Sequence, residues 1–299
     1  MVHIDTLALG SYQTNCHIVS SEESRCIIID PGYNAPAIKD FLERVGVAKA
    51  DSTVDGALLE ACVREALGNS APRGMAVLNP LKVTFSNWEE GKVDEITTEN
   101  HPDHPEMGER TLHFAKTVYI EQEDFMMDPP KKFFRLAPGK EVRLKGAYII
   151  KCEDFVKDAD GNIIELHCTV DMDSRSGSEG ANRKVKGTLH WLSEIDAIPA
   201  ECRLYEPIMN DEEEVDAEIV NEEGEVEEAP AKDFIDRLNP DSLKVLDNCL
   251  VEKTIAEANT GDRFQFLRMG YFCKDKDSSE TPVFNRTVGL KDSWAKVSK

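Results

Sequence analysis

The chain has 299 residues, of which 57 are acidic and 35 are basic, so its net charge at pH 7 is −22. No apolar run approaches the roughly 20 residues that a membrane helix needs, and the N-terminus has neither a basic region nor a small-residue cleavage site. The sequence therefore argues against a membrane-spanning protein and a secretory signal peptide, and it predicts a cytoplasmic globular chain.

The first elements are strand-like runs within residues 1–32. The runs "HIVSS" and "RCIIID" are rich in β-branched residues, and the second ends at "DPG". Further along, the period changes, because apolar residues recur three and four apart in "APAIKDFLERVGV" and "STVDGALLEACVREALG". This spacing predicts two helices, the second capped by Ser52 or Thr53 and ended by Gly68.

From Pro72 onward the chain consists of short strand-like runs separated by Gly, Pro, Asn and Asp. The turn "KDADGN" between two alternating runs indicates a β-hairpin. Many short strands without helices between them favour barrels or sandwiches over a doubly wound sheet. The predicted fold class is therefore mainly β, with a short helical segment ahead of the strands.

The segment "DEEEVDAEIVNEEGEVEE", residues 211–228, carries eleven acids and no base, which is half of the net negative charge. Such a run predicts a solvated, disordered loop, with docking of a protein partner as the alternative. The remainder of the chain is less acidic, and phosphate contacts depend on the local field. The net charge therefore does not exclude RNA as a partner.

The eight cysteines form no C-x-x-C pair, and most of them stand in apolar runs. We expect reduced thiols in a protein core rather than disulfides. The cysteines are Cys16, Cys26, Cys62, Cys152, Cys168, Cys202, Cys249 and Cys273.

The N-terminal stretch "LGSYQTNCHIVSSEESRCIIIDPG" resembles the first strands of the metallo-β-lactamase fold, of the glyoxalase II type. That family holds a metal pair with an H-x-H-x-D-H motif, which this sequence lacks. The "HPDH" at His101–His104 repeats only the tail of the motif, about 70 residues beyond "DPG". We predict no metal site, and a zinc hydrolase fragment remains an alternative.

A second resemblance covers the chain from about Gly32 onward. It rests on the blocks "GYNAPAIKDFLERVGV", "NHPDHPEMGER", "FFRLAPGKEVRLKGAYIIKCE", "RKVKGTLHWLS", "FQFLRMGYFC" and "PVFNRTVGLKDSWAK". In this order the blocks resemble glutaminyl-tRNA synthetase downstream of its catalytic domain. The resemblance implies two β-barrel anticodon-binding domains, preceded by a short helical segment and an orphan β-strand fragment. It also makes "HPDH" part of a loop of an anticodon-binding barrel.

The two resemblances divide the chain into four parts. Residues 1–32 would be a metallo-β-lactamase-like strand fragment, and residues 33–71 a helical connector. Residues 72–180 would form the first anticodon-binding barrel, and residues 181–299 the second, with residues 211–228 as an acidic loop. The C-terminal strands could also return to the first barrel.

The synthetase resemblance implies RNA-binding side chains at six positions. They are Arg73, Arg135, Arg143 and Gln265, with Arg268 and Lys145 as weaker candidates. Arg73 and Gln265 would contact the central uridine of the glutamine anticodon, Arg135 the third base and Arg143 the first. A guanidinium is a rigid fork that suits two acceptors on one base edge. The alternative for each arginine is a surface salt bridge.

The sequence departs from the family pattern at Phe134, where some relatives carry a base, and at Asp103, where relatives often carry a neutral or basic residue. A carboxylate at Asp103 would disfavour contact with phosphate. The implied partner is the anticodon stem-loop of tRNA-Gln, with neither DNA nor a membrane expected.

A class I synthetase also needs a HIGH-like motif and a K-M-S-K-S-like loop in a Rossmann domain that binds ATP. Neither motif occurs here, no Gly-rich phosphate loop replaces them, and no catalytic constellation is evident. We therefore expect no catalytic residue, no cofactor and no glutamine activation by this chain alone, and a separate catalytic chain as a conceivable partner. The ATP and glutamine sites of the family would lie in the missing catalytic domain.

The two resemblances meet near Gly32 in "DPGYNAPAIKDF", so the chain is either a natural fusion or an assembly error. The competing interpretations of the whole are an anticodon-binding module, an acidic protein-interaction module and a zinc hydrolase fragment.

Overall fold

The fold was obtained as a computed structural model. It describes residues 56–208 and 238–291, with secondary structure alone at 2–9, 14–21, 26–29, 218–220 and 226–228 and helical residues at 40–41 and 43–44.

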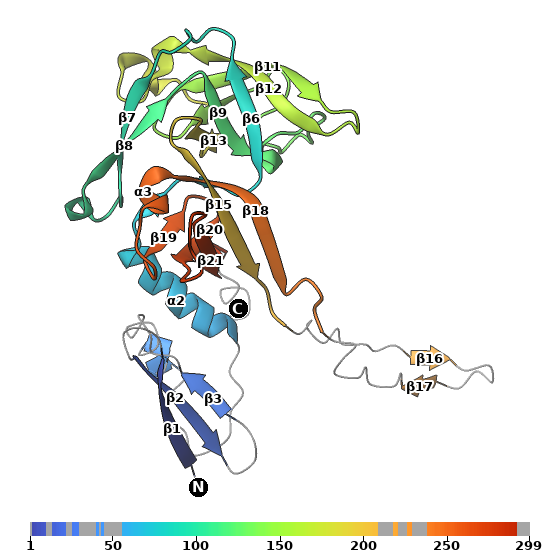
Figure 1. Ribbon diagram of the computed structural model, residues 1–299. Helices are drawn as coiled ribbons and strands as arrows, with labels where there is room; N and C mark the ends of the chain where they lie inside the picture. Colours follow the sequence, from blue (N-terminus) through green and yellow to red (C-terminus); the bar gives the residue numbers. More distant parts are fainter. Residues whose placement is uncertain are drawn as a thin grey trace.

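Two curled seven-stranded sheets account for most of the described chain (Figure 1). The first has the order β13 (Thr188–Leu189), β10 (Glu141–Leu144), β11 (Ile149–Lys157), β12 (Ile163–Asp171), β6 (Pro80–Phe85), β9 (Thr117–Glu121) and β14 (Leu192–Ser193). The second has the order β4 (Arg73–Gly74), β19 (Arg263–Phe266), β20 (Gly270–Lys274), β21 (Val283–Val288), β15 (Ala197–Tyr205), β18 (Leu243–Glu252) and β5 (Ala76–Val77). The predicted mainly β fold with two barrel-like domains is confirmed.

Short one-turn helices connect the strands. They are η1 (Pro105–Met107), η2 (Gln122–Asp124), η3 (Met172–Ser174), η4 (Glu179–Asn182) and the four-residue α3 (Lys253–Ala256).

The hairpin predicted at "KDADGN" is present between β11 and β12, which pair antiparallel from Ile149 opposite Asp171 to Lys157 opposite Ile163. The carboxylate of Asp158 caps the turn, because its Oδ1 accepts from the backbone N–H of Asn162 at 2.8 Å. The local turn chemistry alone was enough to place this element.

The two sheets do not divide the chain at one point, because the strands of the first sheet, β6 to β14, lie in the chain between strands of the second. The short strands β4 and β5 precede the first sheet in sequence but pair with β19 and β18 of the second. The last strands of the first sheet, β13 and β14, pair with β10 and β9 of the same sheet. Among the described C-terminal strands, β19, β20 and β21 all lie in the second sheet. The predicted domain ranges stay a prediction, and a return of these strands to the first barrel is not observed.

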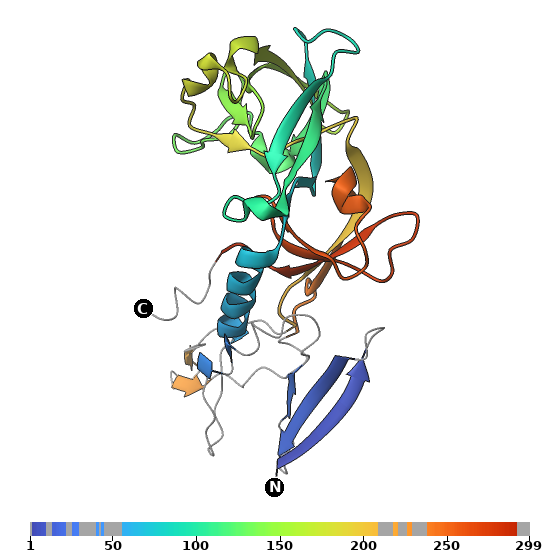
Figure 2. The ribbon, with the colours of Figure 1, turned by 90° about the vertical axis from the view of Figure 1, so that its left-hand side faces the viewer.

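The helix α2 (Gly56–Ser70) lies against the second sheet, where Leu67 packs with Tyr271 and Val288 (Figure 2). The helix passes the predicted stop at Gly68. The backbone N–H of Ala71 still donates to the carbonyl of Leu67 at 2.9 Å, and the following Pro72 has no N–H to continue the ladder. The predicted cap at Ser52 or Thr53 and most of the first predicted helix lie outside the described residues.

A two-stranded hairpin, β7 (Asp94–Glu99) and β8 (Glu109–Phe114), extends from the first sheet toward the second (Figure 1). Its loop contains "HPDH" and reaches the end of α2. This hairpin therefore connects the two halves of the molecule.

At the N-terminus, β1 (Val2–Leu9), β2 (Thr14–Ser21) and β3 (Cys26–Ile29) form a three-stranded antiparallel sheet. Within the acidic segment, β16 (Glu218–Val220) pairs with β17 (Val226–Glu228), a short hairpin that the prediction of a disordered loop did not include. The role of residues 211–228 stays a prediction.

The described cysteines at 62, 152, 168, 202, 249 and 273 are free thiols, and all but Cys273 are buried, as expected for core residues. Within the described part of the chain, no helix is long and apolar enough to cross a membrane.

Tyr148 is predicted to ionise late. Burial, together with the hydrogen bond that its hydroxyl donates to Asp94, raises the pKa of Tyr148 to about 12. An unfolded tyrosine ionises near pH 10, so the stability that this group contributes is complete below that pH and is lost as pH rises toward 12. We expect ultraviolet titration to show a tyrosine step at about pH 12. A Tyr148→Phe variant that retained the late step would contradict the assignment.

Candidate nucleic-acid interface

Arg73 and Gln265 are brought together by the parallel pairing of β4 with β19, in which they stand directly opposite each other. Nε of Arg73 and Oε1 of Gln265 are buried, and neither has a hydrogen-bond partner among the residues that the structure describes. Leaving buried polar atoms unpaired is costly, so such atoms commonly mark a ligand or a water site. This pair presents an open donor and an open acceptor from adjacent strands.

Arg135 and Arg268 meet at one carboxylate, that of Asp124. The guanidinium of Arg268 donates to Asp124 through two bonds, from Nη1 to Oδ2 at 2.7 Å and from Nη2 to Oδ1 at 2.6 Å. Nε of Arg135 lies 3.4 Å from Oδ1 of the same residue. Asp124 is buried, and it raises the pKa of the Arg268 guanidinium. Arg268 therefore joins the second sheet to the first, with its fork already occupied.

A buried histidine extends this ion pair into a network. Nη1 of Arg268 donates to Nδ1 of His190 at 3.2 Å, so the ring carries its proton on Nε2, which faces Oε1 of Glu121 at 3.2 Å. Glu121 also accepts from the backbone N–H groups of Leu78 and Asn79, at 2.8 and 2.9 Å. His190 thus links the two sheets.

Arg143 lies on β10 and Lys145 directly follows that strand, away from the other candidates. The guanidinium of Arg143 donates to the backbone carbonyls of Ser174 at 2.8 Å and Ala181 at 3.0 Å. It therefore anchors the loop that carries η3 and η4. Lys145 is exposed, and its backbone N–H donates to Leu189 at 2.9 Å. Base reading by Arg143 stays a prediction, and it would require these loop contacts to be exchanged.

An exposed aromatic ring stands beside Arg135. The side chain of Phe134 is 50% exposed, and Nζ of Lys186 lies 5.3 Å from its ring centroid. The backbone of Phe134 packs so closely on Gly187 that a Cβ there would collide with the Phe134 carbonyl. Exposed Lys131 precedes the ring in the same loop. An exposed ring with a lysine over it is the combination that stacks a base and attracts phosphate.

The two histidines of "HPDH" form hydrogen bonds that stabilise the hairpin loop. His101 is buried, its Nδ1 accepts from the backbone N–H of Asp103 at 3.2 Å, and its Nε2 therefore donates to the carbonyl of Gly68 at 2.8 Å. His104 is half-exposed, with Nδ1 at 2.8 Å from Oε1 of Glu106. His101 thus ties the hairpin loop to α2, and sequence analysis did not foresee its burial.

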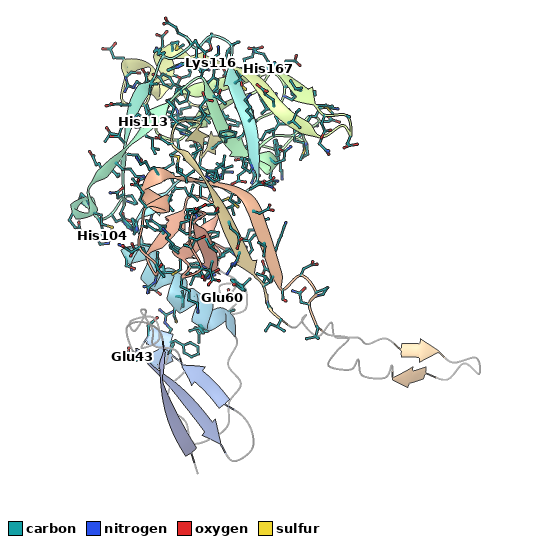
Figure 3. All side chains as sticks on the ribbon, viewed as in Figure 1. Glu43, Glu60, His104, His113, Lys116 and His167 are labelled. Carbon is teal, nitrogen blue, oxygen red and sulfur yellow. The ribbon has the colours of Figure 1, made fainter. Side chains whose placement is uncertain are left out.

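The other histidines are scattered. Figure 3 shows His104, His113 and His167 at separate places on the hairpin and the first sheet. His113 is bound by Asp196, with Nδ1 2.8 Å from Oδ1. Over the described residues, no group of three or more His, Cys, Asp or Glu side chains is placed to hold a metal ion.

Sequence analysis missed four buried charged or polar residues that connect the sheets. They are Asp124, His190, Arg110 and Glu252. Each stands in an ordinary strand or loop pattern, so no local signal marks it, and only the pairing of distant segments gives it a partner.

Two family models match the chain over the regions of the two sheets. Residues 71–171 match one model and residues 188–275 match another, each described as the anticodon-binding domain of class I tRNA synthetases (E and Q). These regions of the chain therefore belong to the anticodon-binding domains of the class I synthetases for glutamate and glutamine.

Among curated proteins, the chain is similar to glutamine–tRNA ligases. It is 48% identical to the enzyme of Nitrobacter winogradskyi over 268 aligned residues. The aligned region covers 89% of this chain and 45% of the relative. It is 46% identical over 268 residues to the enzyme of Vibrio campbellii, covering 89% and 46%. The chain is 45% identical to the enzyme of Clostridium perfringens over 265 residues, which are 88% of this chain and 46% of that enzyme.

The chain thus spans slightly less than half the length of these relatives. The resemblance predicted from about Gly32 onward is confirmed, and the anticodon-binding domains are of the glutamine–tRNA ligase kind. The metallo-β-lactamase resemblance of residues 1–32 stays a prediction.

Proposed function

We propose that this chain binds the anticodon stem-loop of tRNA-Gln and reads its unstacked bases. The observation that carries the proposal is the juxtaposition of Arg73 and Gln265, with a buried open donor and a buried open acceptor on neighbouring strands. An unpaired base offers complementary acceptors and donors on its Watson–Crick edge. The pair is therefore suited to one flipped-out base, which the family resemblance identifies as the central uridine.

The surface around Phe134 supports the same function. A half-exposed ring with Lys186 over its face and Arg135 beside it provides a stacking surface and positive charge. Local cations of this kind offset the net negative charge of the chain, because phosphate responds to the field within about 10 Å at 0.1 M salt. We propose that Arg135 reads the third base and that Arg143 and Lys145 lie near the first. Arg268 acts on RNA indirectly, by holding Asp124 beside Arg135.

Aminoacylation requires ATP and glutamine sites in addition to tRNA binding. We propose that this chain supplies only the tRNA-binding part, without a cofactor of its own, and acts in the cytoplasm with a catalytic synthetase domain. For residues 1–32, the three-stranded sheet β1–β3 is compatible with the proposed metallo-β-lactamase-like fragment.

Replacing Arg73 by alanine is expected to weaken binding of a 17-nucleotide glutamine anticodon stem-loop by about 1–3 kcal/mol, because one forked base contact is lost. Fluorescence anisotropy at fixed salt would measure the affinity. The loss should disappear when the central uridine is replaced by another base.

Arg203→Ala is the matched control, since it removes the same charge from the second sheet. The Arg203 guanidinium is already paired with Glu201 at 2.6 Å and Asp277 at 3.0 Å. It should change affinity little, and equally for both RNAs. Equal affinity of the unaltered protein for the two stem-loops would contradict the proposed function.

A further inference from the structure

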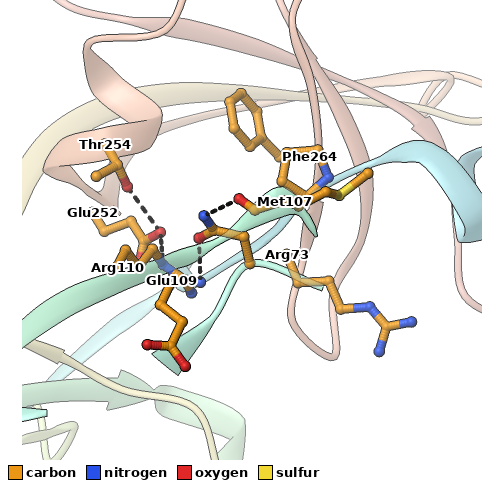
Figure 4. A pocket seen from close by; sticks show the side chains of 9 residues that line it. Arg73, Met107, Glu109, Arg110, Glu252, Thr254 and Phe264 are labelled. Carbon is orange, nitrogen blue, oxygen red and sulfur yellow. Dashed lines mark hydrogen bonds and ion pairs between the residues drawn. The ribbon is translucent and has the colours of Figure 1, made fainter. Parts of the chain in front are cut away.

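A pocket of about 490 Å³ lies between the β7–β8 hairpin and the second sheet (Figure 4). Pockets that bind small molecules usually range from about 300 to 1,000 Å³, so one nucleobase would fit. Arg110 of the hairpin and Glu252 of β18 line it, together with the ring of Phe264 and the side chain of Met107. Arg73 lines the same pocket, which places it next to the proposed base-reading pair.

Arg110 and Glu252 form a buried ion pair across the two halves of the molecule. Their side chains are 7% and 3% exposed, and Nε of Arg110 lies 2.6 Å from Oε1 of Glu252. The same Oε1 accepts from the hydroxyl of Thr254 at 3.0 Å. Nη1 of Arg110 donates to the carbonyl of Glu99 at 3.0 Å. Glu252 is thus engaged through Oε1, and Arg110 through Nη1 and the ion pair.

Each group also has a polar atom that is left unpaired by the described part of the chain. Nη2 of Arg110 and Oε2 of Glu252 are buried, and the described residues offer neither of them a hydrogen-bond partner. Burial raises the pKa of Glu252, although Arg110 opposes the shift. A buried donor and a buried acceptor left unpaired reduce stability. Such an arrangement marks a site that a ligand or an ordered water completes by supplying the missing bonds.

The chemistry of the lining favours a base over a phosphate. Two guanidinium groups, those of Arg73 and Arg110, line the pocket together with two carboxylates, those of Glu109 and Glu252. Their formal charges cancel, so the lining suits a neutral base better than an anionic group. A neutral base carries a donor next to an acceptor on its Watson–Crick edge, which matches Oε2 of Glu252 and Nη2 of Arg110. Phe264 and Met107 supply apolar surface for the base faces.

We propose that this pocket holds one unstacked nucleobase of the anticodon loop, with Glu252 accepting from the base and Arg110 donating to it. The proposal rests on the proposed function, since it requires that the chain bind an anticodon loop. It adds Arg110 and Glu252 to the base-reading residues. It also gives a reason for the ion pair that joins the hairpin to the second sheet.

The variant Glu252→Gln tests the proposal. Glutamine keeps an oxygen that can accept from Thr254 and lie beside Arg110. It places an NH₂ donor where the unpaired Oε2 stood, so two donors face each other and the hydrogen bond from the base is lost. Affinity would be measured for stem-loops in which each loop nucleotide in turn lacks its base. In the unaltered protein, removing the pocket base should weaken binding by about 10-fold. In Glu252→Gln, whose affinity for the complete loop is already reduced, removing that base should cause no further loss.

Glu109→Gln is the matched control, because Glu109 lines the same pocket and the charge change is identical, while its side chain is exposed. This variant should keep the full loss at the pocket position. The proposal is overturned if Glu252→Gln shows the same pattern as Glu109→Gln at every nucleotide.

A second measurement needs no variant, in case Glu252→Gln folds poorly. Stem-loops with a photoreactive base at each loop position would be crosslinked to the unaltered protein and the attached residue identified. A crosslink from one position to Met107 or Phe264 supports the proposal, and no crosslink to the pocket residues from any position overturns it. Failure of the proposed function is distinguishable, since the unaltered protein would then not prefer the glutamine loop over one with an altered central base.

Discussion

Replacing Arg268 by alanine is expected to lower the free energy of unfolding by about 3–5 kcal/mol, because it leaves the buried carboxylate of Asp124 without its main partner. Asp124 is buried, and its carboxylate accepts two hydrogen bonds from Arg268. Arg268 belongs to the other half of the molecule and lies 144 residues further along the chain. Arg135 approaches only one oxygen, at 3.4 Å, so it can compensate little. Urea unfolding followed by circular dichroism would measure the change.

Arg183→Ala is the control for this prediction. Arg183 also pairs with two carboxylates, Glu141 at 2.7 Å and Asp171 at 2.8 Å, but its side chain is 41% exposed. Exposed pairs contribute about 0–1 kcal/mol, so this variant should unfold almost as the unaltered protein does. Combining Arg268→Met with Asp124→Asn removes both charges and should recover much of the loss. If Arg268→Ala cost no more than Arg183→Ala, the interpretation of the network as a link between the sheets would be wrong.

The second large effect is expected at Phe114, whose replacement by alanine should cost about 3–5 kcal/mol. Phe114 is buried at the centre of an aromatic cluster. Its ring centroid lies 5.2 Å from Phe85, 4.9 Å from Trp88 and 5.2 Å from Trp191. Removing the ring would leave a cavity that these rigid neighbours cannot fill. Thermal and urea unfolding would measure the loss.

Phe134→Ala makes the same chemical change on the surface of the same domain. Because half of the Phe134 side chain is exposed, its removal should change stability by about 0.5 kcal/mol or less. It should instead weaken binding of the anticodon stem-loop, since one stacked base is worth about 1–3 kcal/mol. A stability loss at Phe134 comparable to that at Phe114 would show that the ring is structural and would remove it from the proposed interface.

The candidate positions taken from the sequence fall into different structural situations. Arg73 and Gln265 each keep a buried polar atom without a hydrogen-bond partner among the described residues, so neither of these atoms has to give up a contact in order to bind RNA. Arg268 is committed to Asp124 and Arg143 to the carbonyls of its neighbouring loop. The family blocks locate such residues in the chain, but whether a guanidinium is free or occupied depends on partners that are far away in sequence.

Local residue patterns were enough to predict the β-rich character of the chain, the hairpin at "KDADGN" and the succession of family blocks. These features are local, because strand alternation and turn chemistry are set by neighbouring residues. The sequence also showed that "HPDH" belongs to a family block and lacks the rest of a metal motif.

Three contacts could be found only in the folded chain. The strands β4 and β5 join the second sheet, His101 fastens the hairpin loop to α2, and Arg110 meets Glu252 beside a pocket. Each of these contacts joins segments that are distant in the chain. Burial and pairing depend on which segments pack together, and no local pattern of residues carries that information.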